Sequence, residues 1–138
     1  MQRVLAFDIG DKRIGLAVSD PLGITAQGLE TYTRCGDEEK DVQYLLGVAQ
    51  RYKPVYLLFG LPRNMDGSYG FQSEKVRAFV EALTRRWHGE YGYYDERLTT
   101  VSAEKALIEG NVKREKRRQV VDKLAAVIIL QGYLEQRR

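Results

Sequence analysis

Three short apolar runs follow one another within the first 33 residues, and their close spacing is the feature that most constrains the fold. Residues 3–9 form a run that ends at Gly10, residues 15–19 form a second, and residues 24–33 are compatible with a third. The motif Asp20-Pro21-Leu22-Gly23 is typical of a tight turn. Connections this short leave no room for a crossover helix, so the pattern predicts three antiparallel strands.

The rest of the chain alternates between helical and strand-like patterns. Apolar residues recur at helical spacing in two long segments, and each segment is followed by a short run typical of a strand. Three antiparallel strands followed by two parallel ones predict a mixed five-stranded sheet with helices on both faces, which is the order of a ribonuclease H-like fold. The predicted later elements are a helix at 38–52, a strand at 55–59, a helix at 72–87, a strand at 91–95, a short helix from Thr100 or Ser102 to Glu109, and a final helix at 117–136.

Size and composition limit the class of protein. A chain of 138 residues with 43% hydrophobic residues suits one domain with one core, so we expect a single domain over residues 1–138. The longest purely apolar run, residues 124–130, is far below the roughly 18 residues needed to cross a membrane, and no signal peptide pattern is present. Cys35 is the only cysteine, which excludes a disulfide framework. We therefore expect a soluble, cytoplasmic protein.

The positive charge is concentrated late in the chain. The net charge is only +3, but residues 113–118 include Lys113, Arg114 and Arg117 in a basic cluster. Such a cluster suits a polyanion, because each neutralised phosphate releases counterions. A solvated helix start is the alternative interpretation, and the sequence does not decide between them.

Three acids stand out by their positions. Asp8 lies inside an apolar run, where a carboxylate is costly unless it is paired, although an Asp near a glycine also forms turns. Glu96 follows the last predicted strand and is equally compatible with a surface position. Asp122 precedes Ala125 and Ala126 at helical spacing, so its face of the helix becomes apolar within one turn.

The predicted fold brings these three acids together. The strands that carry Asp8 and Glu96 point the same way, and the helix of Asp122 borders the edge where they end. Clustered carboxylates repel one another unless a cation lies between them, and hard oxygen ligands select Mg²⁺ or Mn²⁺. Such ions support in-line displacement at phosphorus, so the three acids predict a metal-dependent phosphodiesterase.

Four motifs in the chain match a known family. Residues 7–20 (FDIGDKRIGLAVSD), 60–67 (GLPRNMDG), 95–100 (DERLTT) and 122–126 (DKLAA) resemble, in order, the motifs of the YqgF family. These proteins are candidate pre-16S rRNA nucleases and are also described as Holliday-junction-resolvase-like. The resemblance covers essentially the whole chain. It implies a ribonuclease H-like fold, a cytoplasmic location and trimming of the 5′ end of precursor 16S rRNA.

The resemblance also assigns residues. It implies that Asp8, Glu96 and Asp122 are the catalytic acids. Our hypothesis is that the same three acids bind the metal, with Asp8 as the central ligand that bridges the metals. Charge and placement suggest further residues for holding phosphates, each with a plain surface role as the alternative. This second set comprises Lys12, Arg13, Arg63, Asn64 and Arg97, together with the basic cluster.

The chain departs from related resolvases in two places. Those proteins carry a second acid one helical turn from the one on the last helix, whereas this chain has Gln119 and Ala125 there. With three acids, a second metal is expected to bind weakly or only with substrate. Asp11 stands where the family often has a small polar residue, and we expect it to cap the turn.

Other functions remain open at this stage. A junction-cleaving DNA endonuclease would need a two-fold dimer, and a non-catalytic nucleic acid binding module would use the acids only in turns and caps. A nucleotide-binding protein of the actin and Hsp70 superfamily would need two such domains. The sequence does not decide whether the substrate is RNA or DNA, or whether the enzyme is an endonuclease or an exonuclease. It also does not decide whether one or two metals bind, or whether the protein is a monomer or a weak homodimer.

Overall fold

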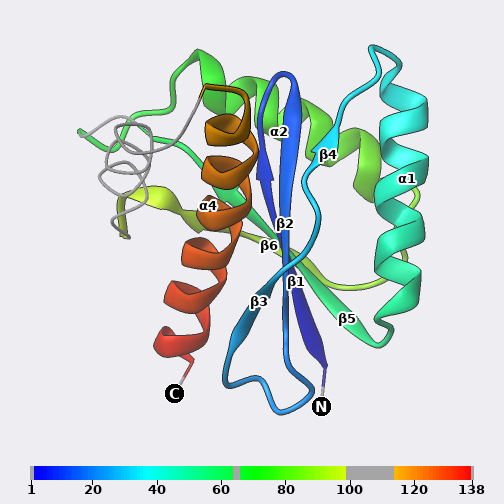
Figure 1. Ribbon diagram of the computed structural model, residues 1–138, viewed down its shortest axis with the longest axis vertical. Coiled ribbons are helices and arrows are strands. Elements are labelled where there is room, and N and C mark those ends of the chain that lie inside the picture. The colour runs from blue at the N-terminus through cyan, green and yellow to red at the C-terminus, as the bar shows by residue number, and fades with distance from the viewer. Residues whose placement is uncertain (1, 64–65, 99–113, 138) are drawn as a thin grey trace.

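The protein forms a mixed sheet in which the first strand is central. The computed structural model describes residues 2–63, 66–98 and 114–137, with side chains described for residues 2–63, 66–97 and 124–137. The strand order is β3-β2-β1-β5-β6, and β4 also pairs with β2 (Figure 1). The strands are β1 (Arg3–Ile9), β2 (Arg13–Ser19), β3 (Ala26–Gly28), β4 (Tyr32–Thr33), β5 (Val55–Leu61) and β6 (Tyr91–Asp95).

The sheet confirms the predicted order, and within the described residues it has six strands in place of five. The run at residues 24–33 was expected to be one strand, and it forms two short ones, β3 and β4, which both pair with β2. Between them the Leu29 side chain packs against the hydrophobic core, and the Glu30 carboxylate accepts a hydrogen bond of 2.5 Å from the Tyr44 hydroxyl. These two contacts take the chain out of the regular ladder and divide the strand.

The parallel strands end at one edge of the sheet. β1 and β2 are antiparallel, whereas β1, β5 and β6 run in the same direction. Phe7 pairs with Phe59, and Gly60 pairs with Tyr94, so the last residues of all three strands lie in adjacent rows. The arrangement predicted from the sequence for the strands of Asp8 and Glu96 is therefore present.

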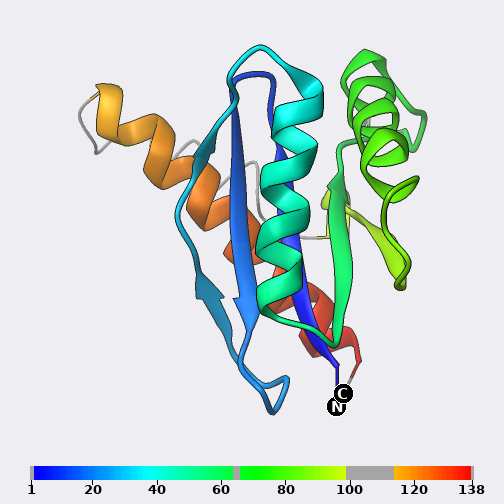
Figure 2. The same cartoon turned by 90° about the vertical axis from the view of Figure 1, so that its right-hand side faces the viewer.

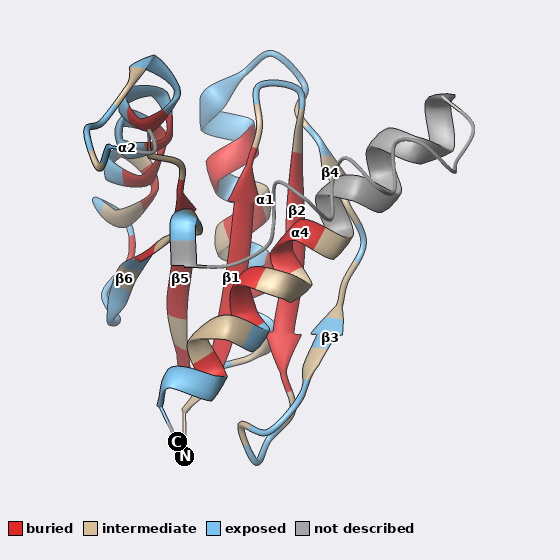
Figure 3. Ribbon diagram, turned by 90° about the vertical axis from the view of Figure 1, so that its left-hand side faces the viewer, coloured by how far each residue is buried: buried red, intermediate tan, exposed pale blue. Residues whose placement is uncertain are grey.

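Helices cover both faces, as predicted. Helices α1 (Glu38–Arg51) and α2 (Phe71–Thr84) pack on one face (Figure 2), and α4 (Arg114–Gln136) crosses β1 and β2 on the other (Figure 3). Helix α2 ends three residues before the predicted Trp87, because the backbone bonds tighten there: the Arg86 amide donates to the Leu83 carbonyl and the Trp87 amide to the Thr84 carbonyl (3.1 Å each). The short helix predicted up to Glu109 lies outside the described residues. No helix in the described part of the chain is long and apolar enough to cross a membrane.

The two faces of the sheet bury side chains of different size. The face under α1 and α2 is built from large residues, including the stacked rings of Phe7 and Phe59 (centroids 4.8 Å apart). The face under α4 carries Ala6 and Ala17, which allow the helix to approach the strands closely. Because side chains alternate along a strand, the residues of β1 that share the α4 face are Val4, Ala6 and Asp8.

Candidate active site at the carboxyl ends of the parallel strands

Asp8 is a buried acid on the sheet face that α4 covers. Its exposure is 7%, and it pairs across the ladder with Gly15 of β2. The turn follows two residues later and is closed by a 2.9 Å hydrogen bond from the Gly10 amide to the Arg13 carbonyl. A Cβ at Gly10 would lie 2.7 Å from that carbonyl oxygen, so a glycine is required there. Asp8 therefore belongs to the strand and not to the turn.

Glu96 reaches the same region from β6. It directly follows the strand as the first residue of the 3₁₀ helix η1 (Glu96–Leu98). A Cβ built on Gly60 would lie 3.4 Å from the Glu96 Oε2 atom and 2.5 Å from the Ile129 Cδ1 atom of α4. The Ile129 side chain thus fills the space that a side chain at Gly60 would need, and the Glu96 carboxylate lies beside it.

Gly60 also connects Glu96 to Asp8. Since Phe7 pairs with Phe59, the next residues along the parallel strands, Asp8 and Gly60, are neighbours. Adjacent strands are about 4.8 Å apart. The fold therefore brings Asp8 and Glu96 to the same edge and the same face of the sheet, with the glycine between them.

The third predicted acid, Asp122, lies in α4, but its side chain is outside the described set. Its helix position is one turn before Ala125 and Ala126, which are buried against the sheet. Among the described side chains, no group of three acids, histidines or cysteines has the arrangement of a metal site. The metal role of Asp122 remains a prediction.

The donors at this edge are hard oxygen ligands. Asp8 and Glu96 supply carboxylates, whereas His88 lies with Lys53 and Pro54 near the start of β5, and Cys35 lies near α1. Carboxylate oxygens are the ligands that Mg²⁺ and Mn²⁺ prefer. The two described acids therefore fit such an ion, and the fold is one whose nucleases generally depend on a divalent metal.

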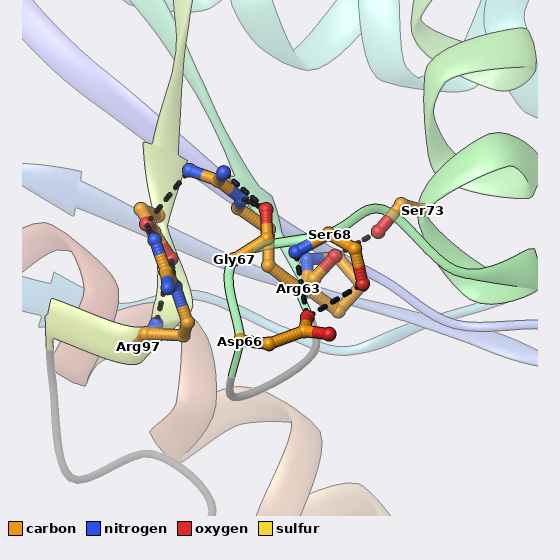
Figure 4. Close-up of polar contacts among 8 residues, drawn as sticks. Arg63, Asp66, Gly67, Ser68, Ser73 and Arg97 are labelled. Atoms are coloured by element: carbon orange, nitrogen blue, oxygen red, sulfur yellow. Dashed lines mark hydrogen bonds and ion pairs between the residues drawn. The ribbon is translucent and has the colours of Figure 1, made fainter.

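Two predicted phosphate-binding arginines meet beside Glu96. The Asp95 carboxylate accepts hydrogen bonds from Arg63 (3.1 Å) and Arg97 (2.8 Å), as Figure 4 shows. Arg63 also donates to the Gly67 carbonyl (3.0 Å), which fixes the loop after β5. We call Arg63, Asp95 and Arg97 the Asp95 cluster. Its two guanidinium groups share the Asp95 carboxylate, and Asp66 adds a second negative charge near Arg97.

Asp95 and Arg97 each stabilise the charged form of the other. Hydrogen bonds from the Arg97 side chain hold the pKa of Asp95 below its usual value, and Asp95 raises the pKa of Arg97. Asp95 therefore stays ionised and orients both arginines. Asp95 was not among the predicted site residues, because its contact with Arg63 depends on the pairing of β5 with β6.

Lys12 and Arg13 occupy a different environment. They line a hollow of about 630 Å³ near the start of α1, together with the acids Asp11, Glu38 and Asp41. The mixed charge of this hollow distinguishes it from the basic surroundings of Glu96. Asp11, expected to cap the turn, lies with its carboxylate 3.5 Å from the Lys75 ammonium group of α2.

The remaining predicted phosphate ligands are only partly described. Asn64 and Lys113 lie outside the described residues. Arg114 and Arg117 fall in the first turns of α4, and their side chains are not among those described. Their proposed contacts with nucleic acid stay predictions.

A buried acid that the sequence analysis did not single out supports the turn after Asp8. The Asp41 carboxylate accepts hydrogen bonds from Tyr32 (2.7 Å), the Arg34 side chain (3.0 Å) and the Cys35 amide (3.2 Å). Arg34 also donates to the Gly10 carbonyl (3.1 Å). We call Tyr32, Arg34, Cys35 and Asp41 the Asp41 cluster. Its only sequence signal was a polar position in the first turn of a helix.

A sheet of this order, with acids where its parallel strands end, defines the ribonuclease H-like class of nucleases. Comparison with known proteins gives the family within that class. The family model RuvX, described as Holliday junction resolvase, matches residues 2–136, so the chain belongs to this family, the YqgF family that its motifs indicated.

Relatives with curated descriptions agree. A protein of Clostridium tetani is 48% identical over 133 residues, covering 96% of each chain. One of Desulforamulus reducens is 49% identical over 133 residues, again covering 96% of each. Both are described as candidate pre-16S rRNA nucleases, and the family is thus one of nucleases.

Solved structures support the fold. The chain is similar to T. thermophilus RuvC in complex with a Holliday junction substrate, with a TM-score of 0.62, 13% identity, and 99% of this chain and 96% of that chain covered. The fowlpox virus Holliday junction resolvase gives a TM-score of 0.56 at 14% identity, covering 99% of this chain and all of the other. These likenesses confirm the ribonuclease H-like architecture.

Proposed function

We propose that this protein is a divalent-metal-dependent nuclease that trims the 5′ end of precursor 16S rRNA in the cytoplasm, with residues 1–138 acting as one catalytic domain. One observation carries the proposal: the Glu96 carboxylate lies beside Gly60 of β5, the residue that neighbours Asp8 of the adjacent strand β1. Two carboxylates gathered at the ends of parallel strands are costly for stability alone, because their charges repel. The descriptions of the relatives support the rRNA substrate.

The acids give the site its metal-binding character. Asp8, Glu96 and, by its helix position, Asp122 would hold the metal, which when bound stabilises charge on the phosphate and activates a water. The backbone of Asp8 is fixed within the ladder of β1 and β2. The backbone of Glu96 is fixed at the start of η1, and its carboxylate lies beside Gly60. This rigidity favours catalysis, since misplaced groups lose much of their effect.

The Asp95 cluster positions the substrate in this proposal. Its two guanidinium groups lie at the segment that carries Glu96, where they attract the phosphates on either side of the bond to be cleaved. During hydrolysis a water oxygen bonds to phosphorus, and the bond to the leaving oxygen breaks. Arg63 and Arg97 would bind non-bridging oxygens as charge develops on them. Lys12, Arg13, Asn64, Lys113, Arg114 and Arg117 would extend the contact with the nucleic acid strand.

The test is a cleavage assay that uses precursor 16S rRNA fragments, single-stranded RNA and four-way DNA junctions. We expect Mn²⁺- or Mg²⁺-dependent cleavage of the rRNA precursor that chelator abolishes. Asp8→Asn and Glu96→Gln should each lower kcat about 1000-fold or more, because each removes an anionic ligand. Asp122→Asn should do the same if its carboxylate completes the site. Glu135→Gln, an exposed acid near the end of α4, is the matched control and should cleave like wild type.

Each outcome assigns a function. Cleavage that survives Asp8→Asn, in a variant that unfolds at the wild-type temperature, contradicts the proposal. Cleavage of junctions alone, by a two-fold dimer, identifies a resolvase, the activity in the description of the family model. Binding without cleavage of any substrate identifies a non-catalytic module.

A further inference from the structure

Two aromatic side chains are exposed between β5 and α2. Phe71, the first residue of α2, is 73% exposed and is the most exposed large hydrophobic side chain in the described part of the chain. Tyr69, two residues earlier, is 45% exposed. Neither ring belongs to the hydrophobic core. Their exposure therefore requires an explanation other than packing.

Both rings carry cationic side chains on their faces. The Arg77 and Arg63 guanidinium groups lie 3.8 Å and 4.5 Å from the centre of the Tyr69 ring. The Lys75 ammonium lies 4.6 Å from the centre of the Phe71 ring. Such contacts are worth only about 0.5–1 kcal/mol at exposed sites. Their effect is to hold three positive charges beside two flat apolar surfaces.

This surface is attached to both acid-bearing segments of the site. Arg63 bonds to Asp95, the residue before Glu96, as Figure 4 shows. At the other end, Lys75 lies 3.5 Å from Asp11, three residues after Asp8. The Ser73 hydroxyl donates to the Pro62 carbonyl and ties α2 to the loop after β5. The rings and cations therefore have a fixed position relative to the candidate active site.

We propose that Tyr69, Phe71, Lys75 and Arg77, the aromatic–basic surface, bind unpaired nucleotides that flank the bond to be cleaved. This proposal rests on the nuclease function and names the substrate form that the site accepts. An unpaired base stacks on the Phe71 ring, and the cations contact the phosphates on either side. A base inside a duplex has both faces covered by its neighbours, so the ring has nothing to stack on. An acidic peptide would satisfy the cations but not the rings.

The experiment measures binding in the full-length Asp8→Asn protein, which retains the surface without cleaving. The probes are fluorescein-labelled single-stranded RNA and DNA of about 12 nucleotides and the corresponding RNA duplex, followed by fluorescence anisotropy. Phe71→Ala should weaken single-strand binding about tenfold and duplex binding less than about twofold. The matched control Leu22→Ala removes a side chain of similar exposure (69%) in the turn after β2 and should change neither.

Two further substitutions separate stacking from general hydrophobic contact. Phe71→Trp should keep or increase the single-strand affinity, and the fluorescence of the new indole should be quenched on binding. Phe71→Leu is apolar but not flat, so it should behave like Phe71→Ala. Arg77→Gln should reduce the salt dependence of binding by about one phosphate contact.

The results distinguish this proposal from the nuclease function. Two results would show that the aromatic–basic surface is not a single-strand site: Phe71→Ala binds single strands as tightly as the Asp8→Asn protein, or it loses as much affinity for the duplex as for single strands. Either result would overturn this proposal even if Asp8→Asn abolishes cleavage. Displacement of the RNA by polyglutamate at equal charge would indicate an acidic protein partner and overturn the proposal. If Phe71→Ala loses single-strand binding and the wild type cleaves no substrate, the proposed single-strand binding is supported and the proposed nuclease function is contradicted.

Discussion

The Asp41 cluster and the Asp95 cluster both join an aspartate to arginine, but they differ in burial and in charge. Each has a carboxylate that accepts hydrogen bonds from an arginine side chain, and each carboxyl has a lowered pKa. They differ in burial: the Asp41 side chain is 1% exposed, and that of Asp95 is 18% exposed. They also differ in charge, since Asp41 balances one arginine and Asp95 is shared by two.

The surroundings of the arginines explain the difference in use. Arg34 is 21% exposed, lies over the Phe79 ring (4.7 Å) and donates to the Gly10 carbonyl. Arg97 follows the end of a strand and is 31% exposed. A guanidinium group that bonds a fully buried carboxylate and a turn carbonyl stabilises the fold. One whose carboxylate is partly exposed and shared with a second arginine can exchange this partner for a phosphate.

The largest expected difference between the two clusters is the loss of stability when the aspartate of each is replaced by asparagine. Asp41→Asn removes a carboxylate that is 1% exposed and accepts three hydrogen bonds, and it leaves Arg34 without this counter-charge, so the free energy of unfolding should fall by about 3 kcal/mol. Asp95→Asn removes partly exposed pairs and should lower it by less than about 1 kcal/mol. Urea unfolding of both variants measures the difference. Equal losses would mean that the two clusters have the same structural role.

Much of the fold was predictable because its signals are local. Strands β1 and β6 have the predicted bounds, since short apolar runs ended by Gly10 and by charged residues leave little choice of register. The division of the third strand was not predictable. It depends on Leu29 and Glu30 meeting α1, a contact between segments that sequence periodicity does not reveal.

The site was predictable to a lesser degree. Asp8 and Glu96 could be placed at one edge from strand order alone, because parallel strands end together. The need for a glycine at position 60 is a property of packing between β5 and Ile129 of α4, beside Glu96. Arg63 could be recognised as a cation, but its partner Asp95 is 32 positions away and comes close only through strand pairing.

The second test replaces the arginines of the two clusters with uncharged glutamine and compares activity with stability. Arg63→Gln and Arg97→Gln should each lower kcat/KM for the rRNA precursor about tenfold, the value of a charge-assisted contact with phosphate, with little change in stability. Arg34→Gln should show the reverse, a loss of stability and near-normal kcat/KM at a temperature where it is folded. Steady-state cleavage and urea unfolding of the three variants give the result. A loss of kcat/KM as large in folded Arg34→Gln as in the other two would contradict the division of roles.

The smallest expected effect is on the dependence of stability on pH. Burial alone would raise the pKa of Asp41, but hydrogen bonds from Tyr32, Arg34 and Cys35 outweigh it and leave the pKa below its usual value. A carboxyl whose pKa is lower in the folded state stabilises the fold above its unfolded pKa of about 3.8, and this contribution is lost as the pH falls.

The stability difference between wild type and Asp41→Asn should therefore be constant above about pH 5 and should narrow below about pH 4. The difference for Asp95→Asn should narrow less, because solvent screens its ion pairs. Urea unfolding at several pH values measures both. A difference that widens on acidification would mean that Asp41 is protonated in the folded protein, and its contact with Arg34 would then be a hydrogen bond to a neutral carboxyl and not an ion pair.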